Sequence, residues 1–191
     1  MRVRPVAPRL LFFLVFLLFV VPAAWQKVAP LAFEAHARLA TQTAAHQASA
    51  VQQLLAEAKS TRTAVLAATT SVGGCKNLSG SAQAFERAAV ARQSQTLTAR
   101  GLDVSFLPHP VRLQTALVTA LDRSYAADNA LAAWAHDVQN RRCSGASLRS
   151  QLRQQADALS ATATAAKASF IALWRPIATR YHHPMPAEVD I

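Results

Sequence analysis

The segment 151-QLRQQADALSATATAAKASFIALWRPI-177 decides the fold, because its apolar residues recur at the spacing of a helix seam. Two sets of residues each repeat every seven positions, and the second set follows the first by three positions. The sets are Ala156, Ala163, Phe170 and Ile177, and Leu152, Leu159, Ala166 and Leu173. This two-position heptad pattern predicts a long helix that buries one stripe against neighbouring helices.

Three more alanine-rich segments are predicted to be helices, at about 31–71, about 81–100 and from Pro110 onward. The larger apolar residues of the first are Leu39, Val51, Leu54, Leu55, Val65 and Leu66. The third carries a stripe that steps by three or four residues: Leu113, Leu117, Leu121, Ser124, Asp128, Leu131, Ala135 and Val138. No strand-like alternation of comparable length occurs in the sequence.

Glycines lie in all three predicted turns between these segments, where they are expected to supply the left-handed backbone at helix ends. They are Gly73, Gly74, Gly80, Gly101 and Gly145. Ser81 is the expected N-cap of the second helix, and Gly101 is the residue expected just past its end. Four amphipathic helices with short loops can bury their stripes together in a bundle. The predicted fold is all-α, an antiparallel four-helix bundle with up-down-up-down topology.

Cys75 and Cys143 follow the first and third predicted helices. In an up-down bundle both of these loops lie at the same end. Two cysteines in an oxidising compartment form a disulfide by default. The sequence therefore predicts a Cys75–Cys143 disulfide at one end of the bundle.

Export is predicted from the N-terminus, where Arg2, Arg4 and Arg9 precede an uninterrupted apolar run, Leu10–Val21. Twelve residues of helix span only about 18 Å, which is short for a bilayer and typical of a cleaved signal peptide. Phenylalanines in the run and Trp25 after it favour a retained anchor instead. We expect residues 1–27 to be a single-pass signal anchor with a cytoplasmic N-terminus, or a signal peptide cleaved from a secreted protein. Residues 28–183 would form the extracytoplasmic bundle, and 184–191 a tail.

The chain is basic, with a formal charge of +10. That excess favours anionic neighbours, although solvated helix faces are also commonly basic. Nucleic acid is not expected as a partner, because no strand motif of a nucleic-acid reader is present. A set of cations flanks the two cysteines: Lys76, Arg141, Arg142, Arg149 and Arg153. This set is predicted to contact an anionic envelope polymer or another envelope protein; the alternative is that it is only the solvated end of two helices.

Catalytic and metal-binding patterns are missing from the sequence. A di-iron bundle needs glutamate followed three residues later by histidine, and Glu34, Glu57 and Glu86 lack that histidine. His36 and His46 are about 15 Å apart along a helix, too far for one ion. No glycine-flanked nucleophile motif or glycine-rich phosphate loop occurs. We therefore expect no enzyme activity, no metal and no cofactor.

Asp128 is the acid that interrupts the stripe of the third helix. With Tyr125 and Trp134 it forms a predicted ligand pocket; the alternative is an edge position paired with an arginine of a neighbouring helix. A cavity lined by Asp128 and aromatic residues would indicate a ligand-sensing bundle working through a partner membrane protein. A solid seam would indicate a structural role. The main expectation is a membrane-anchored extracytoplasmic bundle that acts as a binding or structural component of the cell envelope.

Overall fold

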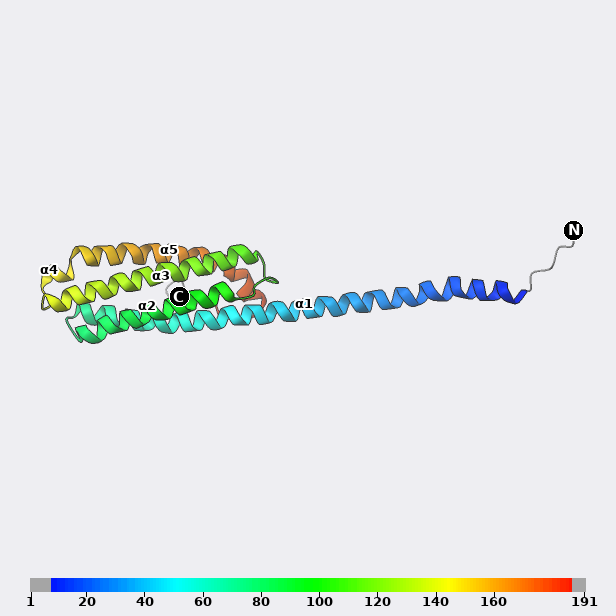
Figure 1. The fold of residues 1–191 in the computed structure, drawn as a ribbon, viewed down its shortest axis with the longest axis horizontal. Coiled ribbons are helices and arrows are strands. Elements are labelled where there is room, and N and C mark those ends of the chain that lie inside the picture. Colours follow the sequence, from blue (N-terminus) through cyan, green and yellow to red (C-terminus); the bar gives the residue numbers. More distant parts are fainter. Residues whose placement is uncertain (1–7, 187–191) are drawn as a thin grey trace. The chain divides into compact units, whose positions relative to one another are not determined.

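The computed structural model describes the backbone of residues 8–186 and the side chains of residues 38–186 (Figure 1). The elements are α1 (Pro8–Gly73), α2 (Leu78–Gly101), α3 (Pro110–Asn140), the short α4 (Gly145–Leu148) and α5 (Gln151–Arg180). The chain divides into two units, residues 1–43 and 44–191. The second unit contains the helical bundle, in which consecutive long helices pack against one another, as in an up-down bundle (Figure 1). The all-helical prediction is confirmed for the described residues.

The predicted leader, Leu10–Val21, lies outside the residues whose side chains are described, and so does the choice between anchor and signal peptide. The predicted tail, 184–191, is described only as far as Pro186. Within residues 38–186, no helix combines the length and the apolar character needed to cross a bilayer.

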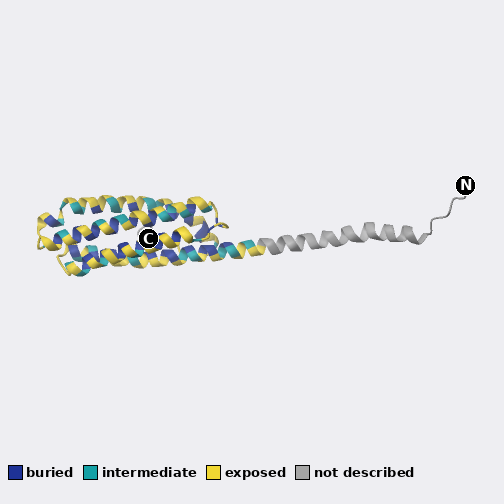
Figure 2. Cartoon of the chain, in the orientation of Figure 1, coloured by how far each residue is buried: buried dark blue, intermediate teal, exposed yellow. Residues whose placement is uncertain are grey.

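The stripe predicted for α3 is confirmed, because all eight of its residues are buried (Figure 2). In α1 the prediction holds for Val51, Leu54, Leu55 and Val65, which are buried. It is wrong for Leu39 and Leu66, which are 62% and 47% exposed. Leu66 lies about 100° around the helix axis from Val65, on the side away from the buried Ala68, and so points out of the core.

The seam of α5 differs from the predicted heptad in its second position. The first set is buried as expected: Ala156, Ala163, Phe170 and Ile177. The second set is only half-buried, namely Leu152, Leu159, Ala166 and Leu173. The inward positions lie four residues after the first set, at Lys167 and Trp174, which are 5% and 0% exposed. The helix is rotated so that the large indole of Trp174 packs in the core. The adjacent Leu173 therefore lies at the edge of the interface.

The predicted disulfide is present between Cys75 and Cys143, whose Cα atoms are 5.8 Å apart. It joins the loop after α1 to the loop after α3, so both loops lie at one end of the bundle. A disulfide of this kind is typical of an oxidising, extracytoplasmic compartment.

The prediction that glycines supply the left-handed backbone is wrong, because no glycine in the described residues has a positive φ. The residues that do are Cys75, Asn77, His109, Arg142, Cys143 and His182. At the end of α3 the amide of Arg142 donates to the carbonyl of Gln139, and that of Cys143 donates to the carbonyl of Val138. These two bonds form a Schellman motif, which satisfies the last carbonyls and holds Arg142 in the left-handed region.

The start of α2 also differs from the prediction. The helix begins at Leu78 with Asn77 as N-cap, and Ser81 is buried inside its first turns. The left-handed conformation of Asn77 reverses the chain directly after the disulfide loop, which leaves room for one more turn of helix before Ser81.

Removal of the disulfide is expected to lower the free energy of unfolding. The bond joins residues 68 apart in sequence, and a loop of this length corresponds to about 4 kcal/mol in the chain-entropy model. Urea denaturation of the Cys75→Ser/Cys143→Ser variant should show this loss. Wild type treated with a thiol reductant should show the same loss, whereas a loss below about 1 kcal/mol in both would contradict the expectation.

The Arg142→Gly variant is expected to have a free energy of unfolding about 1 kcal/mol higher than that of Arg142→Ala. The reason is that φ at this position is 52°, a region in which a Cβ is disfavoured. Urea denaturation of Arg142→Gly and Arg142→Ala compares two variants that have both lost the same charge. Ala133→Gly, at an exposed position inside α3, is the control and should destabilise by a similar amount. Equal stabilities at position 142 would show that the left-handed conformation is not populated.

Candidate functional site

The interior of the bundle contains two apolar clusters separated along its length. The first includes residues within 44–58, 99–121 and 170–178, and the second includes residues within 65–72, 82–88 and 131–138 together with Ala156. Between them each long helix contributes polar or charged side chains, which we call the polar layer: Arg62 of α1, Arg92 and Gln95 of α2, Ser124 and Asp128 of α3, and Lys167 of α5.

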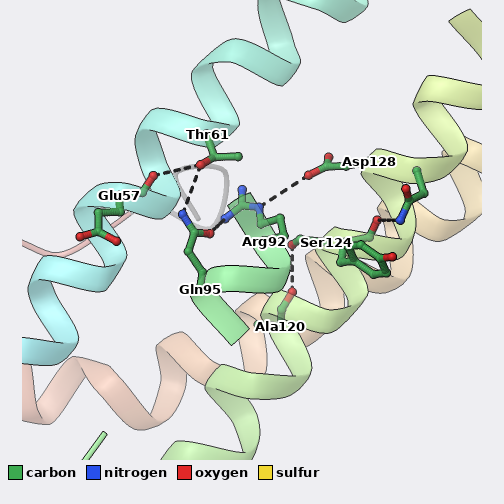
Figure 3. A network of polar contacts seen from close by, with 9 residues as sticks. Glu57, Thr61, Arg92, Gln95, Ala120, Ser124 and Asp128 are labelled. Carbon is green, nitrogen blue, oxygen red and sulfur yellow. Dashed lines mark hydrogen bonds and ion pairs between the residues drawn. The ribbon is translucent and has the colours of Figure 1, made fainter. Parts of the chain in front are cut away.

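Arg92 is the most deeply buried cation of the polar layer, with 1% of its surface exposed. Its Nη1 donates to Oε1 of Gln95 at 3.2 Å, and Nε2 of Gln95 donates to Oγ1 of Thr61 at 3.2 Å (Figure 3). The Thr61 hydroxyl in turn donates to the backbone carbonyl of Glu57. This chain of bonds connects α2 to α1 through the middle of the bundle.

Asp128 faces Arg92 from α3, with 3.6 Å between Oδ2 of the carboxylate and Nε of the guanidinium (Figure 3). This separation gives an ion pair but is too long for a hydrogen bond. The Ser124 hydroxyl donates to the carbonyl of Ala120. Asp128 Oδ2 and Arg92 Nε are therefore both buried without a hydrogen bond to protein, and so is Nε of Arg62.

A cavity of about 30 Å³ lies at this point, enough for roughly two water molecules. Its polar lining consists of Arg62, Arg92, Ser124, Asp128, Ser160, Thr164 and Lys167. Small residues, Ala127 and Ala163, complete the wall. Three cations and one carboxylate thus surround a space that can admit water or a small ion.

Burial shifts the pKa values of the charged groups. It raises the pKa of Asp128 to about 6, although the nearby Arg92, Lys167 and Arg62 act in the opposite direction. It lowers the pKa of Lys167 to about 8, and repulsion from Arg92 and Arg62 adds to that effect. Burial also lowers the pKa of Arg92, against the attraction of Asp128. The charge of the polar layer therefore changes close to neutral pH.

The predicted pocket of Tyr125, Asp128 and Trp134 does not form as one site. Asp128 lines the cavity, but neither aromatic residue does. Tyr125 is 38% exposed, and Trp134 is buried in the second apolar cluster, where its Nε1 donates to the carbonyl of Ser147. The alternative was that Asp128 lies at the edge of the helix stripe and pairs with an arginine of a neighbouring helix. Asp128 does pair with an arginine, Arg92 of α2, but it is buried and not at an edge.

Sequence reasoning missed Arg62, Arg92 and Lys167. A signal for two of them exists, because Lys167 falls between Ala163 and Phe170 on the buried stripe of α5, and Arg92 has a similar place in α2. A cation on an otherwise apolar stripe indicates a buried polar contact. The identity of the partner, however, depends on how the helices align.

The cations near the disulfide do come together at one end of the bundle, and we call this group the basic tip: Lys76, Arg141, Arg142, Arg149 and Arg153. All are exposed except Arg153, which is half-buried with its guanidinium 4.5 Å from the centre of the Trp134 ring. Asp137 pairs with Arg141 at 2.7 Å, and Asp157 pairs with Arg153 at 2.9 Å. The remaining three cations form no ion pair within residues 38–186.

No group of three or more histidine, cysteine, aspartate or glutamate side chains that could hold a metal ion occurs within residues 38–186. His136 instead pairs with Glu86 at 2.8 Å on the surface. His36 lies outside the described side chains.

No protein-family model matches this chain, and neither a curated protein nor a solved structure shows significant similarity to it.

Stability is expected to fall as the pH rises from about 4 to about 6. The pKa of Asp128 is about 6 in the folded chain and near 3.9 when unfolded, so the folded state binds the extra proton in this window. The loss should be on the order of 1–3 kcal/mol. Urea denaturation across this range measures it.

Asp128→Asn should remove this slope, because the amide does not titrate. Asp122→Asn, at a half-exposed position on the same helix, should leave the slope in place. Lys167 acts in the opposite sense at high pH: its pKa of about 8 in the folded chain means that stability rises between about pH 8 and 10.5. A flat wild-type profile between pH 4 and 6 would show that Asp128 is not buried as described.

Proposed function

We propose that this chain is a membrane-anchored, extracytoplasmic bundle of the cell envelope whose basic tip binds an anionic envelope polymer. The observation that carries the proposal is the Cys75–Cys143 disulfide, which holds two basic loops against each other. The disulfide also supports an extracytoplasmic location.

The charge of the two loops is one-sided. Residues 71–81 and 138–153 contain Lys76 and four arginines, and no acidic residue. The carboxylates of Asp137 and Asp157, just outside these segments, neutralise one arginine each. The excess positive charge is thus concentrated at Lys76, Arg142 and Arg149, where a polyanion can contact it and where its strength depends on salt.

The basic tip is also built to keep its shape. Arg142 is held by the Schellman motif at the end of α3, and Ser144 caps α4 by accepting a hydrogen bond from the amide of Ser147. Because less conformational freedom is lost on binding, cations on such a frame bind an anion better than cations on a loose tail.

The position of the basic tip fits a tethered protein. Within the bundle, α1 runs from Ala44 to Gly73 and reaches the tip at its end, about 45 Å further along the helix axis. The chain enters the bundle at Ala44, so the basic tip lies at the end of the bundle opposite to that entry.

A ligand-sensing bundle that works through a partner membrane protein is the second candidate, and the cavity at Asp128 is the observation that favours it. The cavity has no aromatic lining and holds only about 30 Å³, too little for an organic ligand. Any ligand sensed there would have to be of the size of an ion.

Neutralising the basic tip is expected to weaken binding to immobilised teichoic acid, a polyphosphodiester, by about tenfold or more at low ionic strength. The variant replaces Lys76, Arg141, Arg142 and Arg149 by glutamine in the full-length protein in detergent. Retention on the column over a salt gradient is the measurement.

A control variant replaces four exposed arginines on the sides of the bundle by glutamine, and so has the same net charge: Arg87, Arg112, Arg123 and Arg175. It should elute close to wild type. Equal weakening by both variants would show that net charge, and not the basic tip, determines retention. A tip effect seen on immobilised polyglutamate and not on teichoic acid would replace the polymer with an acidic protein as partner.

A further inference from the structure

The cavity of the polar layer is surrounded by more positive than negative charge. Arg62, Arg92 and Lys167 line it from three helices, and Asp128 is the one carboxylate on its wall within the described residues. Uncompensated charge is costly to bury, so a cluster with an excess of buried cations favours a bound counterion.

Two guanidinium donors at this cavity form no hydrogen bond to protein. Nε of Arg92 is buried, belongs to a side chain that is 1% exposed, and is 3.6 Å from the carboxylate of Asp128. Nε of Arg62 is also buried without a hydrogen bond to protein. Buried donors in native structures are nearly always satisfied, so these two indicate a hydrogen-bond acceptor inside the cavity.

The volume limits what that acceptor can be. A cavity of about 30 Å³ holds roughly two water molecules, or one ion of similar size. Water would satisfy the two donors and Oδ2 of Asp128 but would leave the excess positive charge in place. A monatomic anion would satisfy the donors and also balance the charge. Arg62 and Ser160 are half-buried and Thr164 is exposed, so the path to solvent runs past these residues.

We propose that the centre of the bundle binds one halide-sized monovalent anion, such as chloride, between Arg62, Arg92 and Lys167. This site is separate from the basic tip and does not depend on the proposed envelope function. The bound anion links α1, α2 and α5 by accepting hydrogen bonds and balancing their charge, and so it stabilises the folded bundle.

Anion binding is coupled to the protonation of Asp128. The carboxylate is the one negative group facing the cavity, opposite Arg62 of α1, Arg92 of α2 and Lys167 of α5. Its protonation removes a repulsion on the anion, so affinity increases as the pH falls through about 6. By linkage, the bound anion in turn raises the pKa of Asp128.

The test compares thermal unfolding of the full-length protein in sodium chloride and in sodium gluconate at equal ionic strength. Gluconate is too large for the cavity, so only specific binding separates the two series. At a chloride concentration about five times the dissociation constant of the site, Tm should be roughly 2–4 °C higher in chloride than in gluconate. The difference should be larger at pH 5 than at pH 7. Equal Tm values in both salts would overturn the proposal.

Three variants identify the site. Arg62→Gln removes a half-buried cation and should abolish most of the chloride effect, whereas Arg175→Gln, exposed on α5, should keep it. Asp128→Asn works in the opposite direction and should enlarge the effect and make it independent of pH between 5 and 7. Because Asp128→Asn is expected to strengthen binding, the proposal stays testable if Arg62→Gln does not fold. An unchanged chloride effect in both Arg62→Gln and Asp128→Asn would place the anion elsewhere.

Crystals grown with bromide provide a direct observation. An anomalous peak between Arg62, Arg92 and Lys167 is the expected result. Water alone in the cavity at a bromide concentration that raises Tm would contradict the assignment.

Discussion

The burial of two cations and one carboxylate in the middle of the bundle is the constraint on which the rest of the structure depends. Arg92, Asp128 and Lys167 are almost fully inaccessible, and they come from three different helices. A buried cation without compensation is unfavourable, so the helices must align at the height where these groups face one another. A slide of one helix by a single turn would place a charge against one of the apolar clusters. The polar layer thereby disfavours alternative alignments that an alanine-rich bundle would otherwise tolerate.

The two ends of the bundle are closed by different means. At one end the disulfide joins the loops after α1 and α3. At the other end the loop between α2 and α3 is held by side-chain amides. Gln114 donates to the carbonyls of Ala99, Arg100 and Leu102, and Gln47 accepts from the amide of Phe106. Covalent closure at the basic tip keeps its like-charged residues close together, despite their mutual repulsion.

The basic tip and the polar layer both concentrate positive charge, but in different surroundings. Charges at the tip are mostly exposed and screened by salt, so they suit reversible contact with a large polyanion. Charges in the polar layer are shielded from solvent, where each interaction is stronger and the space is small. The two proposed anion sites thus differ in the size of the anion that they would admit and in its access from solvent.

The sequence by itself determined the elements and one long-range contact. The stripe of α3 from Leu113 to Val138, the inward positions Phe170 and Ile177 of α5, and the Cys75–Cys143 pair were all predicted. Helical periodicity identifies the face that a residue lies on, and the order of the helices identifies which loops share an end. Neither requires knowledge of how the helices rotate or align.

Only the tertiary structure decided the composition of the site. Periodicity does not specify the height at which Asp128 of α3 meets Arg92 of α2, or that Trp174 and not Leu173 faces inward. The helix ends were mispredicted for a related reason: the Schellman bonds at Arg142 outweigh the intrinsic preference for glycine in the left-handed region. Each of these outcomes depends on packing between helices, where a few side chains of large volume or buried charge select one alignment from several with similar apolar burial.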